Sequence, residues 1–116
     1  MGFLTTHVLD TALGKPAAGV SIALYRIDGD AREKLAETVT NEDGRTNSPI
    51  LPENLFETGV YELIFMAGDY LRQSGQAHSE PLFLDQVPIR FGMSEDNHYH
   101  VPLLLSPYGM STYRGS

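Results

Sequence analysis

Apolar and polar residues alternate over several short segments of the chain, which is the pattern of half-buried β-strands. The alternation is cleanest in residues 3–10 (FLTTHVLD), 19–27 and 59–67. Further strands are predicted at residues 35–40, 82–91, 98–105 and 111–114, and a short one could begin at Arg45, giving seven or eight in all. The polar residues of 35–40 predict that this strand lies at a sheet edge. The proline inside 82–91 indicates either an edge strand or a bulge.

Turn-forming residues separate the predicted strands. The segment NEDG at residues 41–44 is a strong turn signal, because Asn, Asp and Gly tolerate the backbone angles of tight turns. Residues 69–75 form a short helix or a loop, with Asp69 as a candidate N-cap and Gly75 as a stop. Without repeats or linkers, the pattern predicts a single all-β domain over residues 1–116, an antiparallel sandwich with one small helix.

Composition narrows the classes of function. The chain has no cysteine, which excludes disulfides, thiolate metal sites and a cysteine nucleophile. A net charge of -7 argues against nucleic acid as a partner. No apolar run approaches the roughly 20 residues of a membrane span, and the first residues lack the pattern of a signal peptide. We therefore expect no membrane partner and a cytoplasmic protein.

Four features could carry chemistry: His7, Arg45, the pair His98 and His100, and the segment YRGS at residues 113–116. Each has an ordinary structural explanation, since strand histidines and arginines after turns are commonly no more than surface residues. In residues 3–10 the alternation puts His7 on the same face as Thr5. His98 and His100 likewise share one face of their strand, so with His7 they could form a zinc triad or remain polar surface.

Other chemistries lack support in the sequence. It contains no glycine-rich phosphate loop, no nucleophile elbow of the form Gly-x-Ser-x-Gly, and no helical His-Glu-x-x-His motif. Phosphoryl transfer, acyl transfer by a serine elbow and zinc-protease chemistry are therefore disfavoured.

Three segments together are typical of one family. They are LTTHVLD at residues 4–10 with GKPA at 14–17, TNEDGR at 40–45, and YHVPLLLSP at 99–107 continuing to STYRGS at 111–116. On these segments the chain resembles the transthyretin-like proteins, and among them the 5-hydroxyisourate hydrolases of uric acid degradation. The terminal YRGS is the most specific match. Met110 departs from the pattern, since tyrosine is usual there, and we expect it to alter packing or channel shape.

The resemblance implies a sandwich of two four-stranded sheets with one short helix. It also implies a homotetramer, a dimer of dimers, with active sites in the channel where the dimers meet. The reaction implied is hydrolysis of 5-hydroxyisourate to 2-oxo-4-hydroxy-4-carboxy-5-ureidoimidazoline by attack of water on a cyclic amide, with no cofactor and no metal.

By the same resemblance, His7, Arg45 and His100 are expected to be catalytic. One histidine would take the proton from water, and the arginine would bind ring carbonyls and stabilise negative charge. The residues expected to bind substrate are Tyr113, Arg114, Gly115 and Ser116, with His98 in a lesser role.

Three other interpretations stay open. A non-catalytic carrier of small molecules would have the same fold, and the polarity of its channel would distinguish it from the hydrolase. A zinc site built from the three strand histidines would be detected by metal analysis. A structural sandwich without any ligand is the third.

Overall fold

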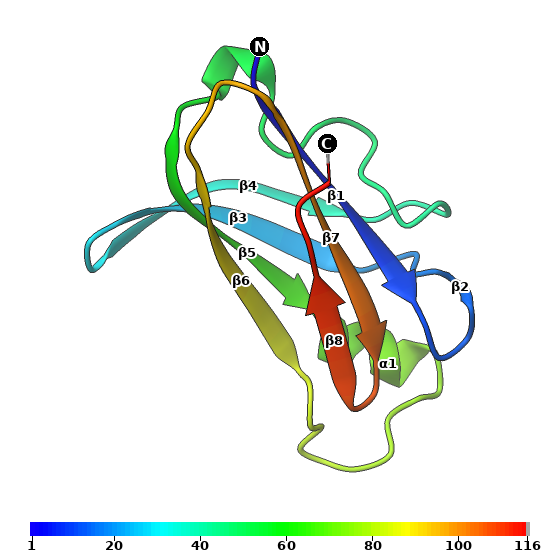
Figure 1. The fold of residues 1–116 in the computed structure, drawn as a ribbon. Coiled ribbons are helices and arrows are strands. Elements are labelled where there is room, and N and C mark those ends of the chain that lie inside the picture. The colour runs from blue at the N-terminus through cyan, green and yellow to red at the C-terminus, as the bar shows by residue number, and fades with distance from the viewer. Residues whose placement is uncertain (116) are drawn as a thin grey trace.

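Two four-stranded sheets pack face to face in the computed structural model, which describes residues 1–115 (Figure 1). The first sheet has the order β2-β1-β7-β8, formed by Lys15–Pro16, Phe3–Asp10, His98–Ser106 and Gly109–Thr112. The second has the order β4-β3-β5-β6, formed by Ala31–Val39, Ser21–Asp28, Gly59–Met66 and Gln86–Met93. A short 3-10 helix, Glu53–Leu55, precedes β5, and helix α1, Ala67–Gln73, follows it directly. The predicted two-sheet sandwich with one short helix is therefore confirmed.

The core lies between the sheets and is built by the predicted alternation. In β1 every second residue is buried, namely Leu4, Thr6, Val8 and Asp10. The other sheet contributes large side chains such as Tyr61 and Phe65, both fully buried. Burial of each large apolar side chain is worth about 1.5–3 kcal/mol. Because successive side chains of a strand point to opposite faces, the odd-numbered residues of β1 point away from the core, toward the outer face of the first sheet.

Several strand boundaries differ from the predicted ones. Strand β4 begins at Ala31 because Gly29 (φ 60°) makes a tight turn that lets Ala31 pair with Asp28. Strand β6 begins at Gln86 because its partner β5 ends at Met66, just before α1. The residues before Gln86 therefore have no strand residue of β5 to pair with. Strand β4 is an edge strand, as predicted, and of the two alternatives for β6, an edge strand or a bulge, the structure shows the edge strand.

The last hairpin is also shifted from the prediction. Strand β8 begins at Gly109, which pairs with Ser106 across a two-residue connection, and it ends at Thr112. Helix α1 begins at Ala67, so Asp69 lies in its first turn and is not the N-cap. Gly75, with φ 78°, follows the helix as the expected stop.

Strands β1 and β7 pair in parallel, whereas the sequence pattern predicted antiparallel pairing throughout. The register runs from Phe3 beside His98 to Asp10 beside Leu105. Both strands run in the same direction, side by side, near the two ends of the chain (Figure 1). This pairing brings the two histidine-containing segments together.

A buried carboxylate fixes α1 against the end of β1. Asp10 accepts hydrogen bonds from the Tyr70 hydroxyl at 2.6 Å, from the Gln76 amide at 2.9 Å and from the Leu13 backbone N–H at 2.8 Å. Burial alone would raise the pKa of Asp10, but these donors outweigh it and lower the pKa.

No helix in residues 1–115 is long and apolar enough to cross a membrane.

Candidate active site

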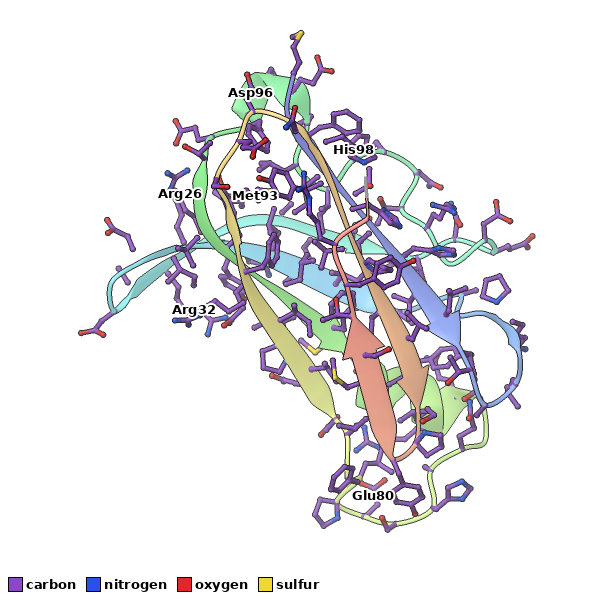
Figure 2. All side chains as sticks on the ribbon, in the orientation of Figure 1. Arg26, Arg32, Glu80, Met93, Asp96 and His98 are labelled. Carbon is purple, nitrogen blue, oxygen red and sulfur yellow. The ribbon has the colours of Figure 1, made fainter. Side chains whose placement is uncertain are left out.

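The outer face of the first sheet carries an open pocket of about 760 Å³. Its walls come from β1, from the loop after the NEDG turn, from the start of β7 and from the segment after β8. The lining residues include Thr5, His7, Arg45, His98, His100 and Tyr113. Figure 2 labels His98, which lies where β7 begins.

The parallel register places the side chains of β1 and β7 in contact. Phe3 stacks on the His98 ring, with centroids 4.0 Å apart and planes 7° apart. The hydroxyl of Thr5 lies 2.8 Å from Nε2 of His98 and also 2.8 Å from Nδ1 of His100. His98 and His100 therefore face the same side of β7, as predicted, and one threonine joins them.

The NEDG turn holds His7 and Arg45 at the pocket. Nε2 of His7 donates a hydrogen bond to the backbone carbonyl of Asp43 at 2.9 Å. Residue 45 bridges to residue 7 as an isolated pair, so Arg45 lies in a loop and not in the short strand considered from the sequence. The side-chain oxygen of Asn41 accepts the backbone N–H groups of Asp43 and Arg45, which shapes the turn.

Glycine is required at the end of this turn. The carbonyl of Gly44 accepts the N–H of Val8 at 2.8 Å, and its φ is 74°. A Cβ at position 44 would lie 2.4 Å from the Val8 carbonyl oxygen and 3.2 Å from the His7 ring. The close approach that positions His7 beside the turn thus depends on the absence of a side chain.

His7 and His100 have lowered pKa values. For His7 the main cause is burial and the second is the positive charge of Arg45, while the Asp43 carbonyl acts in the opposite direction. For His100 burial again leads, followed by Arg45, His7 and His98. At neutral pH both rings are therefore predominantly uncharged, and an uncharged imidazole is the form that can accept a proton. Their ring centroids are 6.3 Å apart.

The segment after β8 lies against His100. The backbones of Gly115 and His100 exchange two hydrogen bonds, of 2.6 and 3.3 Å. A Cβ on Gly115 would lie 3.1 Å from the imidazole Cδ2. Arg114 stacks on the Tyr99 ring, with its guanidinium carbon 4.1 Å from the centroid. The Tyr99 hydroxyl in turn accepts two backbone N–H groups, from Ser94 and Glu95.

Most residues predicted for the site line the pocket together: His7, Arg45, His98, His100, Tyr113 and Gly115. Arg114 is not among the lining residues, and Ser116 lies outside the described residues. Within residues 1–115 no three His, Asp or Glu side chains are grouped as metal ligands.

Sequence reasoning missed Thr5 and the loop residues Thr46, Asn47 and Ser48, which also line the pocket. The available signal for Thr5 was its position two residues before His7, on the same face of the strand.

The fold and the pocket define a transthyretin-type sandwich with a polar, histidine-lined site on the outer face of one sheet. The model of the HIUase/Transthyretin family matches residues 4–115. The chain belongs to this family.

Three relatives illustrate the range of the family. The 5-hydroxyisourate hydrolase of Mesorhizobium japonicum is 66% identical, over 99% of this chain and 93% of that protein. The crystal structure of (S)-allantoin synthase has a TM-score of 0.92 and 46% identity; the match covers 99% of this chain but 44% of that one. Sea bream transthyretin, solved in complex with thyroxine, has a TM-score of 0.85 and 26% identity, over 97% of this chain and 93% of that one.

Proposed function

We propose that this protein hydrolyses 5-hydroxyisourate to 2-oxo-4-hydroxy-4-carboxy-5-ureidoimidazoline in uric acid degradation. The observation that carries the proposal is the meeting of His7, Arg45 and His100 at one pocket. The 66% identity to a 5-hydroxyisourate hydrolase over nearly the whole of both chains supports the same reaction. Two uncharged imidazoles and a guanidinium suit hydrolysis of a small polar ring.

The bond broken in this reaction is the carbon–nitrogen bond of a cyclic amide. The oxygen of water adds to the carbonyl carbon, the ring nitrogen leaves with a proton, and the ring opens to a carboxylate. A pocket histidine takes the proton from water as general base, and the planar guanidinium of Arg45 stabilises the negative charge that develops on the carbonyl oxygen. Tyr113 and Gly115 also line the pocket and would contact the substrate. We include Arg114 and Ser116 in the substrate-binding proposal, Arg114 through its hold on the segment next to His100.

His7 offers one atom for proton transfer. A carbonyl oxygen can only accept a hydrogen bond, so Nε2 of His7 carries the hydrogen that it donates to Asp43. In the uncharged ring Nδ1 is then the remaining acceptor. If His7 is the base, it acts through Nδ1.

The second candidate function is a non-catalytic carrier of small molecules, which the structural likeness to transthyretin favours. The polarity of the pocket argues against it. Three histidines and an arginine line the cavity, and such groups suit a polar, anionic ring better than an apolar ligand.

The proposal includes a homotetramer built as a dimer of dimers, with the pocket at the interface between dimers. In the single chain the pocket is open, and β6 and β8 are unpaired edge strands at which a second chain could continue the ladder. It also includes a cytoplasmic location, with which the absence of cysteine agrees and which cell fractionation would test.

The reaction is tested by following the ultraviolet decay of 5-hydroxyisourate freshly made by uricase, with and without the protein. We expect strong acceleration over the spontaneous decay, and a loss of at least about a hundredfold in Arg45→Ala. Arg32→Gln is the matched control, because Arg32 is an exposed arginine far from His98 in Figure 2. A folded protein that gives no acceleration would overturn the proposal and favour the carrier, and ligand screening of the pocket would follow.

A further inference from the structure

One threonine hydroxyl lies between two imidazole rings. Thr5 Oγ1 is at hydrogen-bond distance, 2.8 Å, from both His98 Nε2 and His100 Nδ1. All three side chains are partly buried on the outer face of the first sheet. The arrangement follows from the register, since Thr5 pairs with His100 and Phe3 pairs with His98 in the parallel ladder.

A hydroxyl has one hydrogen to donate, so the two bonds cannot be equivalent. If Thr5 donates to His100, then Nδ1 of the uncharged His100 ring is unprotonated and the ring hydrogen is on Nε2. In that case His98 must donate from its own Nε2 to Thr5. If Thr5 donates to His98 instead, then Nδ1 of His100 carries the ring hydrogen and Nε2 of His100 is unprotonated (bare). The direction of this short chain therefore sets which nitrogen of His100 can accept a proton.

We propose that Thr5 and His98 are positioning residues that couple the tautomer of His98 to that of His100, so that His100 presents a bare Nε2 when Thr5 donates to His98. This inference rests on the proposed hydrolysis. It assigns a role to a residue that the sequence did not single out, and it gives His98 a function through His100 in place of a contact with substrate.

The coupling also accounts for the proton that His100 accepts. When Nε2 of His100 takes a proton from water, its Nδ1–H still donates to Thr5, and Thr5 still donates to the lone pair of His98 Nε2. A shift of both hydrogens along the chain leaves His100 uncharged and His98 protonated, with no proton gained or lost overall. The positive charge can thus reside on either ring while Nε2 of His100 keeps the hydrogen needed by the leaving nitrogen.

The surroundings hold this chain in place. Phe3 stacks on His98 from one side, and the backbone of Gly115 holds His100 from the other. The charged and titratable groups that face His100 from other segments are His7 and Arg45, which both disfavour a second positive charge on its ring. No carboxylate in residues 1–115 bonds to either ring of the chain, so the hydroxyl is their shared partner.

The decisive variants are Thr5→Val, which removes the hydroxyl but keeps the branched shape, and Thr5→Ser, which keeps the hydroxyl. In the uricase-coupled assay we expect Thr5→Val to lower kcat by about ten- to a hundredfold, part of what a general base contributes, with KM nearly unchanged. Thr5→Ser should stay within about threefold of the starting protein, as expected if the hydroxyl alone matters. Thr11→Val is the control, since Thr11 bonds a backbone carbonyl at the far end of β1, outside the pocket.

Nitrogen-15 NMR of the histidine rings gives a readout that does not depend on activity. We expect the tautomer populations of His98 and His100 to change together in Thr5→Val and to remain unchanged in Thr11→Val. Loss of kcat with an unchanged His98 tautomer would overturn the coupling and leave Thr5 a packing role, and full activity of Thr5→Val would overturn it as well. If the starting protein does not hydrolyse 5-hydroxyisourate, the proposed function fails, while the NMR comparison still decides whether the rings are coupled.

Discussion

At the scale of single residues, the proposed mechanism requires histidines that stay uncharged. Burial and the charge of Arg45 lower the pKa of both His7 and His100 below the ordinary value of 6.5. A lowered histidine pKa means that the uncharged form persists to lower pH, and that protonation, when it comes, removes the base. With His7 or His100 as the proposed base, we therefore expect activity to persist on the acid side of neutrality.

This gives a prediction for the pH dependence of the reaction. We expect kcat/KM to be flat above neutral pH and to fall as pH drops through an apparent pKa below 6.5. Arg45→Gln removes a positive charge, so it should raise both histidine pKa values and move the acid limb to higher pH. The measurements are pH–rate profiles and proton NMR titration of the rings, with Arg32→Gln as the control. An acid limb that does not move in Arg45→Gln would contradict the electrostatic role.

Position 115 shows how a missing side chain can matter as much as a present one. Gly115 has a φ that other residues can adopt, so its requirement comes from the nearby His100 ring and not from backbone strain. The terminal segment lies close to this imidazole because Gly115 has no Cβ.

At the scale of elements, the segment after β8, residues 113–115, packs against the start of β7 and helps to hold it in place. Arg114 rests on Tyr99 and Gly115 bonds to His100, so adjacent residues of the segment hold adjacent residues of the strand. Arg114 thus contacts the tyrosine whose hydroxyl accepts two N–H groups of the loop before β7, while Gly115 also lines the pocket.

A substitution at Gly115, in the segment after β8, should lower activity with little effect on stability. Gly115→Ala places a Cβ 3.1 Å from the His100 ring, so the ring must shift by a few tenths of an ångström. Since a small misplacement of a catalytic group can be costly, we expect kcat to fall by about tenfold with little change in Tm. Gly109→Ala is the matched control, because its added Cβ would make an ordinary contact of 3.5 Å with the side chain of Ser106. Equal activity of the two variants would remove Gly115 from the positioning of His100.

The alternation of residues predicted most strands, because one face of each sheet is buried and the period of two records which face. It could not predict the parallel pairing of β1 with β7, since a ladder partner distant in the sequence leaves no local trace. It also could not predict that β6 begins at Gln86, because that boundary depends on where β5 turns into α1.

The site was predictable only in part for the same reason. Spacing alone put His98 and His100 on one face, but the meeting of His7, Arg45 and His100 was expected from the family resemblance. The contact of Thr5 with both histidines follows from the register of β1 against β7, which the sequence pattern does not contain.

At the scale of the whole molecule, the pocket lies on the exposed outer face of the first sheet, and we expect the protein to assemble into an oligomer. The first sheet presents its histidines outward, and each sheet has an edge strand available for pairing, β8 in one and β6 in the other. An assembly that continued both ladders and closed the open face would complete the walls of the site.

We therefore predict that the active species is a tetramer. Light scattering coupled to gel filtration should give a mass of four times the 12.8 kDa of one chain. If the pocket is completed by a second dimer, activity per chain should fall when dilution dissociates the assembly, because each site loses a wall. A monomer or dimer with full activity per chain would contradict the interface location of the site.

The parallel pairing of β1 and β7 has a consequence for synthesis of the protein. Thr5 and His98 are 93 positions apart, so the ribosome synthesises Thr5 and His7 long before it synthesises the histidines of β7. Until β7 emerges, β1 has no neighbour on that side, and such non-local pairing is slow to form. Nascent chains that lack β7 carry His7 without His100, so the proposed catalytic pair can form only after β7 has been synthesised.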